Sequence, residues 1–209
     1  IKRFVEAGVI PAVGHCDADY KTARAAFNAG STLMTHMFNA MNGIHHRKPG
    51  PIPAALEDSR VTIELINDGF HVENPVLRMA FDAAPNRIAF VTDAMAATGC
   101  ADGAYKLGAL DVTVTGGHAR LVSNGAIAGS TLILEVAVER AAKELGIGLP
   151  TAIAAATLIP ARALGVDKPN AITSAPLGLV EKGYAADLLL LNPGTLAVEH
   201  VWCDGHKIS

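Results

Sequence analysis

Two histidines of this sequence stand where they could bind a divalent metal ion. His15 and His36 each come directly after a short apolar run, residues 9–14 and 31–35. Neutral imidazole nitrogens from separate strands suit zinc and related divalent ions, with a carboxylate or water completing the shell. Either histidine alone would serve equally well as an ordinary polar residue at a strand end. Their equivalent positions in adjacent units favour a shared metal site.

Two further ionisable residues also follow apolar runs. Asp93 comes after residues 88–91, where its carboxylate could bind the metal or act as a general base on an activated water. It could instead cap a helix or turn. His71 ends the segment at residues 67–71, and Gly69 allows a sharp turn that could direct the imidazole at a substrate. A solvent-exposed loop histidine is the alternative, and we expect Asp68 to support the turn rather than the chemistry.

A long loop at residues 37–58 follows the second histidine. Asn39 stands between apolar neighbours, where its amide could hydrogen-bond an anionic or carbohydrate group. Arg47 belongs to the one dense basic cluster of the chain, residues 45–48. It is suited to a bidentate contact with a phosphate or carboxylate, although a solvated basic loop explains the cluster equally well.

The elements that carry these residues alternate between strand and helix. Strands are predicted at residues 9–14, 31–35, 61–66 and 88–91, with helices between them that we expect to begin at Asp17 and Asn74. Repeats of about 20 to 30 residues are typical of a parallel sheet. In a parallel barrel all four strands would present their final polar residues on one face, whereas an open doubly wound sheet would scatter them. The α/β barrel is therefore favoured.

Beyond Asp93 the pattern changes to short strands. Residues 105–123 predict an antiparallel hairpin insertion that turns at Gly116-Gly117, with His118 at the surface. Two helical segments follow, to about residues 145 and 164, and strands return at residues 178–181, 186–191 and 198–202. We predict a barrel part at residues 1–175 and a small β subdomain at residues 176–209.

Composition narrows the class of protein. The chain has 209 residues, of which 50% are hydrophobic, enough for a real core. A net charge of −3 and no apolar run of about 18 residues argue against nucleic-acid and membrane partners. Three widely spaced cysteines favour a reducing, cytoplasmic location. The first residue is Ile1 rather than Met, and we expect the chain to be part of a larger protein.

Taken together, five motifs in this order resemble the N-acetylglucosamine-6-phosphate deacetylases of the amidohydrolase superfamily. They are Gly14-His15, Thr35-His36-Met37-Phe38-Asn39-Ala40-Met41, Asp68-Gly69-Phe70-His71, Val91-Thr92-Asp93-Ala94-Met95 and Ile127-Ala128-Gly129-Ser130. The second string is specific to the deacetylases. Residues 178–188 are similar to the closing β segment of the wider superfamily.

The resemblance implies the C-terminal half of a distorted (β/α)8 barrel with part of a small β-sandwich. It also implies one or two divalent metals, Zn²⁺ being the expected ion. By position, His15 and His36 correspond to metal ligands and Asp93 to the catalytic acid and base. The residues that correspond to substrate contacts are Asn39, Ala40, Arg47, His71, Ile127, Ala128 and Gly129. In the family the basic residue at Arg47 reaches the phosphate of the neighbouring subunit, which implies a homodimer.

The implied reaction is hydrolysis of the acetamide of N-acetylglucosamine 6-phosphate, in amino-sugar catabolism and cell-wall recycling. The family also uses a glutamate and histidines from earlier strands, which have no counterpart before Val9. We therefore expect the chain alone to be inactive and poorly stable until an N-terminal half, in the same protein or a companion chain, completes it. A dihydroorotase-like or dipeptidase-like enzyme and a non-catalytic half-barrel are the alternatives.

Overall fold

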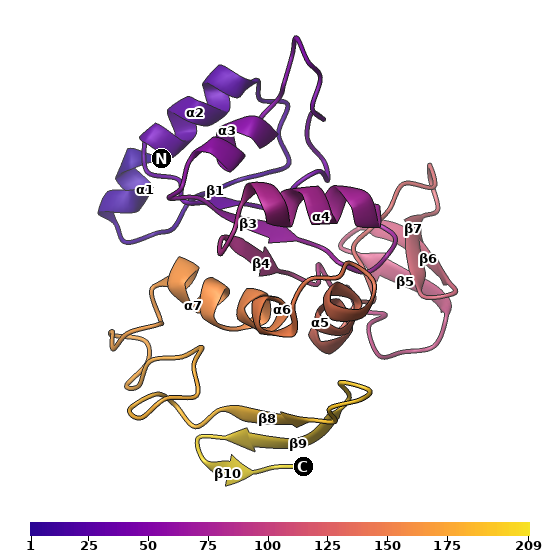
Figure 1. Ribbon diagram of the computed structural model, residues 1–209. Coiled ribbons are helices and arrows are strands. Elements are labelled where there is room, and N and C mark those ends of the chain that lie inside the picture. The colour runs from indigo at the N-terminus through magenta and orange to yellow at the C-terminus, as the bar shows by residue number, and fades with distance from the viewer.

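A four-stranded parallel sheet is the centre of the molecule (Figure 1). The computed structural model describes residues 1–209. The strands are β1 (Ala12–Val13), β2 (Leu33–Met34), β3 (Thr62–Leu65) and β4 (Ile88–Phe90). They pair in chain order, β1-β2-β3-β4, and each pair is parallel. The predicted α/β class is therefore confirmed. Because the strands are parallel, their carboxyl ends, which the polar residues follow, lie at one edge of the sheet.

Seven helices accompany the sheets: α1 (Lys2–Glu6), α2 (Tyr20–Asn28), α3 (Ile52–Glu57), α4 (Asn74–Ala83), α5 (Leu134–Lys143), α6 (Leu149–Ala156) and α7 (Leu158–Leu164). The helix α1 has no counterpart in our expectations. The cap of α2 is Asp19, whose carboxylate accepts from the Thr22 N–H at 2.8 Å, and the expectation of Asp17 is wrong. Asn74 is the first residue of α4, and Glu73 occupies the cap position. No helix is both long and apolar enough to cross a membrane.

The main core lies between the parallel sheet and its helices. Ile63 and Leu65 of β3 pack there with Leu77 of α4, all fully buried. Because side chains alternate along a strand, Thr62 and Glu64 point to the opposite face. In Figure 1, β3 and β4 lie between α4 on one side and α5, α6 and α7 on the other.

Two small antiparallel sheets follow. The first contains β5 (Gly103–Leu107), β6 (Leu110–Thr115) and β7 (His118–Leu121), and it agrees with the predicted strands. Gly116 and Gly117 both have positive φ, 58° and 77°, as a two-residue hairpin turn requires. The second contains β8 (Leu188–Leu191), β9 (Val198–Cys203) and the unexpected β10 (His206–Lys207).

The strand predicted at residues 178–181 is wrong. This segment forms no ladder. Instead, Gly178 packs on α7 with φ 104°, where a Cβ would lie 2.9 Å from the Cα of Leu158. Its close approach to the helix backbone, rather than pairing with a strand, sets the path of this segment.

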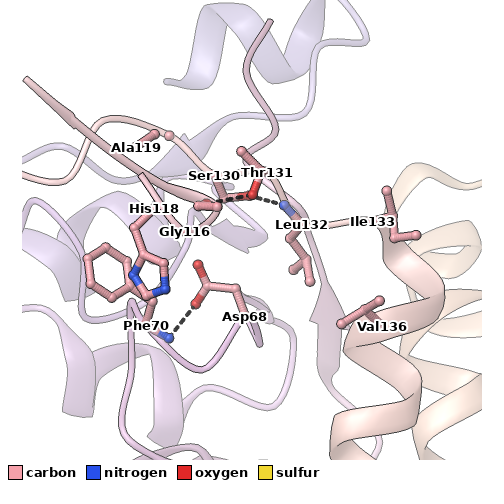
Figure 2. Close-up of a pocket in the computed structure, with 12 residues that line it drawn as sticks. Asp68, Phe70, Gly116, His118, Ala119, Ser130, Thr131, Leu132, Ile133 and Val136 are labelled. Carbon is pink, nitrogen blue, oxygen red and sulfur yellow. Dashed lines mark hydrogen bonds between the residues drawn. The ribbon is translucent and has the colours of Figure 1, made fainter. Parts of the chain in front are cut away.

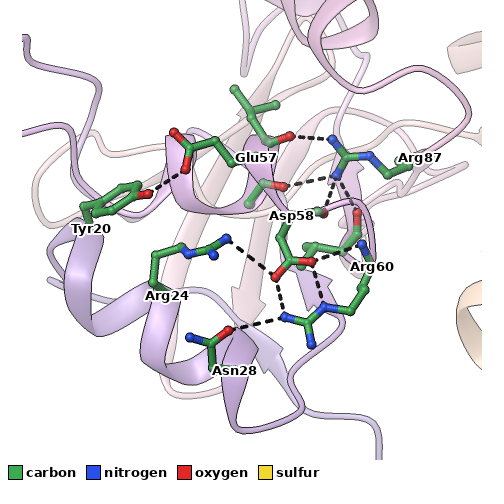
Figure 3. A network of polar contacts seen from close by, with 10 residues as sticks. Tyr20, Arg24, Asn28, Glu57, Asp58, Arg60 and Arg87 are labelled. Carbon is green, nitrogen blue, oxygen red and sulfur yellow. Dashed lines mark hydrogen bonds and ion pairs between the residues drawn. The ribbon is translucent and has the colours of Figure 1, made fainter.

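An ionic network joins α2, α3 and the start of β3 (Figure 3). The Asp58 carboxylate accepts from the Arg60 guanidinium at 2.6 and 2.8 Å, and Arg24 lies 3.7 Å away. Arg87 donates to four backbone carbonyls around the end of α3, those of Ala55, Leu56, Asp58 and Val61. These carbonyls have no partner within α3, so Arg87 serves as its C-terminal cap.

Candidate metal and catalytic site

The two predicted metal-binding histidines meet at the ends of adjacent strands. His15 follows β1 and His36 follows β2, and these strands are paired in parallel. Their Nε2 atoms lie 2.7 Å apart, and their rings meet edge to face with centroids 4.6 Å apart. His36 is buried, at 5% exposure, while His15 is open to solvent. The pair therefore forms one side of an accessible site.

Backbone strain is concentrated at these strand ends. Eight residues other than glycine have positive φ, a conformation that costs energy for residues with a Cβ. Five of them follow β1, β2 or β4: His15 (44°), His36 (25°), Phe38 (81°), Ala40 (50°) and Asp93 (51°). Strained backbone of this kind is commonly retained where it aims a functional side chain. The clustering makes this edge of the sheet a candidate functional site.

The third predicted residue, Asp93, lies beside the loop at residues 127–131. Its carbonyl accepts from the Ser130 N–H at 2.7 Å, and the Ser130 hydroxyl donates to the Thr92 carbonyl. Gly129 has φ 68°, and a Cβ there would lie 3.1 Å from the Asp93 carbonyl oxygen. Ala128 is buried beneath the β5–β7 sheet, while Ile127 is exposed at its margin. The structure thus places Asp93 and Gly129 side by side.

Sequence reasoning missed Glu64, which lies between these groups. It stands on the face of β3 opposite the core, and its Oε2 accepts from the His36 N–H at 3.4 Å. Burial raises the pKa of the Glu64 carboxyl, and the charge of Asp93 adds to this, against the opposing effect of His36. A charged residue inside the run Thr62-Ile63-Glu64-Leu65 was the signal that could have found it.

His71 and Asp68 form a second, well-shielded pair. The His71 Nδ1 lies 2.6 Å from the Asp68 Oδ2, and the side chains are 5% and 12% exposed. The Asp68 Oδ1 also accepts from the N–H groups of Phe70 and His71, each at 2.8 Å. Burial alone would raise the pKa of Asp68, but the hydrogen bonds from His71 and Phe70 outweigh it and lower that pKa.

We had expected Asp68 only to support a turn, but its carboxylate also contacts the His71 ring. Because its Oδ2 faces the ring Nδ1, the neutral imidazole carries its proton there and leaves Nε2 free for a ligand. Gly69 sits in the same turn at φ 79°, and a Cβ there would lie 2.5 Å from the Arg140 guanidinium. Because the His71 side chain is only 5% exposed, the alternative of a solvent-exposed loop histidine is excluded.

A cavity of about 210 Å³ adjoins Asp68 and Gly129 (Figure 2). It lies between the β6–β7 turn and the start of α5, and its wall includes Phe70 and His118. The Phe70 and His118 rings meet edge to face at 4.1 Å, with the Arg120 guanidinium 4.8 Å from the Phe70 centroid. His118, expected only at the surface, thus helps to form a recess beside the predicted substrate residues.

The remaining predicted residues divide into two groups. Asn39 and Ala40 lie on the loop directly after His36, and the Asn39 amide donates to the carbonyls of His36 and Met37 at 3.2 and 3.4 Å. Arg47 is exposed, and the one polar contact of its side chain is with the His46 Nε2, at 2.6 Å. Within one chain the structure does not bring Arg47 to the other predicted site residues.

The donor set fits part of a metal shell. Two imidazole nitrogens at about 2.0–2.1 Å from a tetrahedral ion lie roughly 3.3 Å apart, so a small outward movement of the rings would admit an ion. The buried His36 Nδ1 has no hydrogen-bond partner. No group of three or more His, Cys, Asp or Glu side chains in the chain is placed to hold a metal. His15 and His36 can therefore hold an ion only together with further ligands.

Comparisons with known proteins identify a family and similar chains. The amidohydrolase family model matches residues 5–208. An N-acetylgalactosamine-6-phosphate deacetylase of Escherichia coli O157:H7 is 38% identical over all of this chain and 53% of its own length. An N-acetylglucosamine-6-phosphate deacetylase of Vibrio furnissii is 34% identical over 99% of this chain and 50% of its own length.

A solved structure is similarly close. It is an aspartate-to-alanine mutant of the N-acetyl-D-glucosamine-6-phosphate deacetylase of Mycobacterium smegmatis in complex with N-acetyl-D-glucosamine-6-phosphate. It superposes with a TM-score of 0.88 at 41% identity, over 99% of this chain and 53% of that one. The chain thus spans about half the length of the curated relatives and of the solved structure that it matches.

Proposed function

Because this chain belongs to the amidohydrolase family, we propose that it carries most of the active site of an N-acetylhexosamine-6-phosphate deacetylase. The observation that carries the proposal is the convergence of His15 and His36 at adjacent strand ends, in an edge that also holds Asp93. The reaction is hydrolysis of the acetamide of N-acetylglucosamine 6-phosphate to glucosamine 6-phosphate and acetate. The names and identities of the relatives support this substrate class.

In this proposal each residue has one task. His15 and His36 hold a divalent metal ion, with Zn²⁺ favoured by the two imidazole donors. Such an ion, when bound, lowers the pKa of water and polarises a carbonyl. Asp93 accepts a proton from the attacking water and then gives it to the departing amine. Because Asp93 is exposed and carries no hydrogen bond on its carboxylate, it is free to exchange that proton.

Substrate recognition falls to the surrounding loops. His71 is held by Asp68 with its Nε2 free, which suits a contact with the sugar phosphate. In this proposal Asn39 and Ala40, which directly follow His36, contact the sugar from one side. The loop at residues 127–129, in which Gly129 lies against Asp93, contacts it from the other. Arg47 points outward, which is consistent with a phosphate contact made across a homodimer.

The fold extends the proposal to the whole enzyme. We infer that residues 1–175 form the C-terminal half of a (β/α)8 barrel and that residues 176–209 form part of a small β-sandwich. The strands β1 and β4 are the two edges of the parallel sheet, and a closed barrel would pair both. The missing metal ligands would then come from the N-terminal half of the barrel, in the same protein or a companion chain. Three free cysteines fit a cytoplasmic enzyme.

One specific observation favours a second candidate substrate. The Escherichia coli relative, at 38% identity, is a deacetylase of the galactosamine epimer. The two epimers differ only in the orientation of one hydroxyl, which a single polar side chain can distinguish. A dihydroorotase-like or dipeptidase-like activity and a non-catalytic half-barrel remain the other readings. A panel of both epimers, with and without the 6-phosphate, separates these candidates by acetate release.

The central test is Asp93→Asn in the complete enzyme, meaning this chain with the half that completes it. The variant is expected to lose roughly 10²–10⁴-fold in turnover, because the amide cannot shuttle the proton. Its Zn²⁺ content, measured by elemental analysis, should be unchanged. The exposed Asp82→Asn variant on α4 is the matched control and should keep full activity. A wild-type rate for Asp93→Asn would refute the assignment.

A further inference from the structure

Glu64 is a half-buried carboxylate at this edge to which the proposed reaction gives no task. It lies at the middle of the parallel sheet, in register with Ala89 of β4 and on the face turned away from the apolar core. We propose that Glu64 is a positioning residue for the metal site, which anchors the strained backbone of His36 and places a negative charge beneath the bound cation. The inference rests on the proposed function of the His15–His36 pair.

The first step of the argument is the anchor. His36 has φ 25°, so its backbone needs external contacts to stay in this conformation. Glu64 supplies two on consecutive residues: its Oε2 accepts from the His36 N–H at 3.4 Å, and its main-chain carbonyl accepts from the Met37 N–H at 2.8 Å. Both contacts hold the turn that directs the His36 ring towards His15.

The second step is the charge. A half-buried carboxylate in a sheet interior requires compensation, and Glu64 forms no ion pair and accepts only the one long hydrogen bond on its side chain. A cation held by the adjacent histidines would offset the cost of this partial burial. Glu64 is not itself placed as a third ligand, because no such group of three exists in the chain. Its role resembles that of the outer carboxylates that orient ligands and tune metal affinity, but Glu64 acts through the His36 main chain and not through the ring Nδ1, which has no partner.

The experiment measures the Zn²⁺ affinity of the complete enzyme, meaning this chain with the half that completes it, by competition with a chromogenic chelator. Glu64→Gln keeps an oxygen that can accept from the His36 N–H but removes the charge. Glu64→Leu removes both while keeping the approximate size. His36→Ala reports on the site itself, and Asp82→Asn controls for the loss of one surface negative charge. Thermal unfolding of each metal-free variant is recorded in parallel.

We expect Zn²⁺ to bind roughly 10-fold more weakly to Glu64→Gln and up to roughly 100-fold more weakly to Glu64→Leu. The metal-free Glu64→Leu enzyme should unfold at or above the wild-type temperature, because a half-buried carboxylate without an ion pair has been replaced by an apolar side chain. A purely structural role would instead lower the unfolding temperature.

Two results would overturn the inference alone: wild-type affinity in Glu64→Leu, or a fall in its metal-free unfolding temperature that parallels the loss of affinity. In both cases His36→Ala would still lose Zn²⁺. If wild type binds Zn²⁺ no better than His36→Ala, the proposed metal site fails and the inference fails with it.

Discussion

His15, His36 and Asp93 each adopt a left-handed backbone at the point where a parallel strand ends. The cost of this conformation is of order 1 kcal/mol per residue, and the sheet ladder before each residue supplies the rigidity that sustains it. The consequence is directional. Side chains that would otherwise continue the alternation of the strand are turned towards a common edge, where two imidazoles meet at 2.7 Å.

The Asp68–His71 pair orients a second histidine, and this leads to a prediction. Asp68→Asn removes the acceptor that keeps the proton on His71 Nδ1, so the free Nε2 is no longer presented in a defined state. We expect KM for the 6-phosphate sugar in the complete enzyme to rise roughly 10- to 100-fold, the equivalent of one charge-assisted hydrogen bond. Steady-state kinetics with phosphorylated and unphosphorylated sugar would measure it.

The control for this variant is Asp82→Asn, which changes the same charge far from any hydrogen-bond network. If KM for the phosphorylated sugar stays unchanged while kcat falls, His71 acts on the reacting bond and not on the phosphate. That outcome would contradict the recognition role proposed for His71.

At the scale of elements, the connection from α3 to β3 depends on charged side chains more than on apolar packing. Arg87 caps the carbonyls that α3 leaves free, and Asp58 organises Arg60 and Arg24 around the following turn. The hydrogen bonds from Arg60 are the main reason that the pKa of Asp58 falls to about 2. This network fixes the start of β3, the strand that carries Glu64.

The depressed pKa of Asp58 predicts how stability changes with pH. The carboxyl is harder to protonate in the folded chain than in the unfolded chain, where its pKa is 3.8. The contribution of Asp58 to the free energy of unfolding is therefore complete above pH 3.8 and is lost as the pH falls towards 2. Because Arg60 is largely exposed, we expect only about 1–2 kcal/mol from this source.

Asp58→Asn tests this expectation. The variant should be less stable than wild type by about 1–2 kcal/mol at pH 7, and the difference should shrink as the pH falls below 3.8. Urea unfolding at several pH values measures both. The surface variant Asp82→Asn should show no such pH-dependent difference. An Asp58→Asn deficit that persists unchanged at low pH would show that packing, not charge, is responsible.

At the scale of the whole molecule, the parallel sheet has two open edges and the site lacks ligands. The strands β1 and β4 each pair on one side only, and the apolar side chains of Val9 and Ile10 beside β1 are exposed. Unpaired edges with exposed apolar neighbours favour association with further strands. The proposed closure of the barrel with a complementary half would account for both observations.

This leads to a prediction about assembly. The protein isolated from its source should contain strands beyond this 21.6 kDa chain, in the same polypeptide or in a tightly bound companion. Intact mass spectrometry and native mass measurement test this directly. The complete assembly should bind Zn²⁺ and deacetylate the sugar phosphate, and the 209-residue chain alone should not. Robust deacetylase activity from the isolated chain would contradict the closure model.

The strand–helix alternation was predictable because it depends on local patterns. The runs at residues 61–66 and 88–91 are apolar enough to specify buried strands, and Gly116-Gly117 specifies a hairpin turn. Residues 178–181 look equally strand-like, yet the close approach of Gly178 to α7 removes them from any sheet. The choice of Asp19 over Asp17 as the α2 cap was likewise open, because both side chains suit the position.

The sequence by itself determined which side chains could do chemistry, because His15, His36, His71 and Asp93 each interrupt or follow an apolar run. Only the tertiary structure decided which of them lie together. It joined His15 to His36, paired His71 with Asp68, put Gly129 against Asp93 and left Arg47 apart. It also placed Glu64, which in the sequence looked like an ordinary strand residue, next to His36. The physical reason is that pairing register and backbone turns set these distances, and both depend on contacts between residues far apart in the chain.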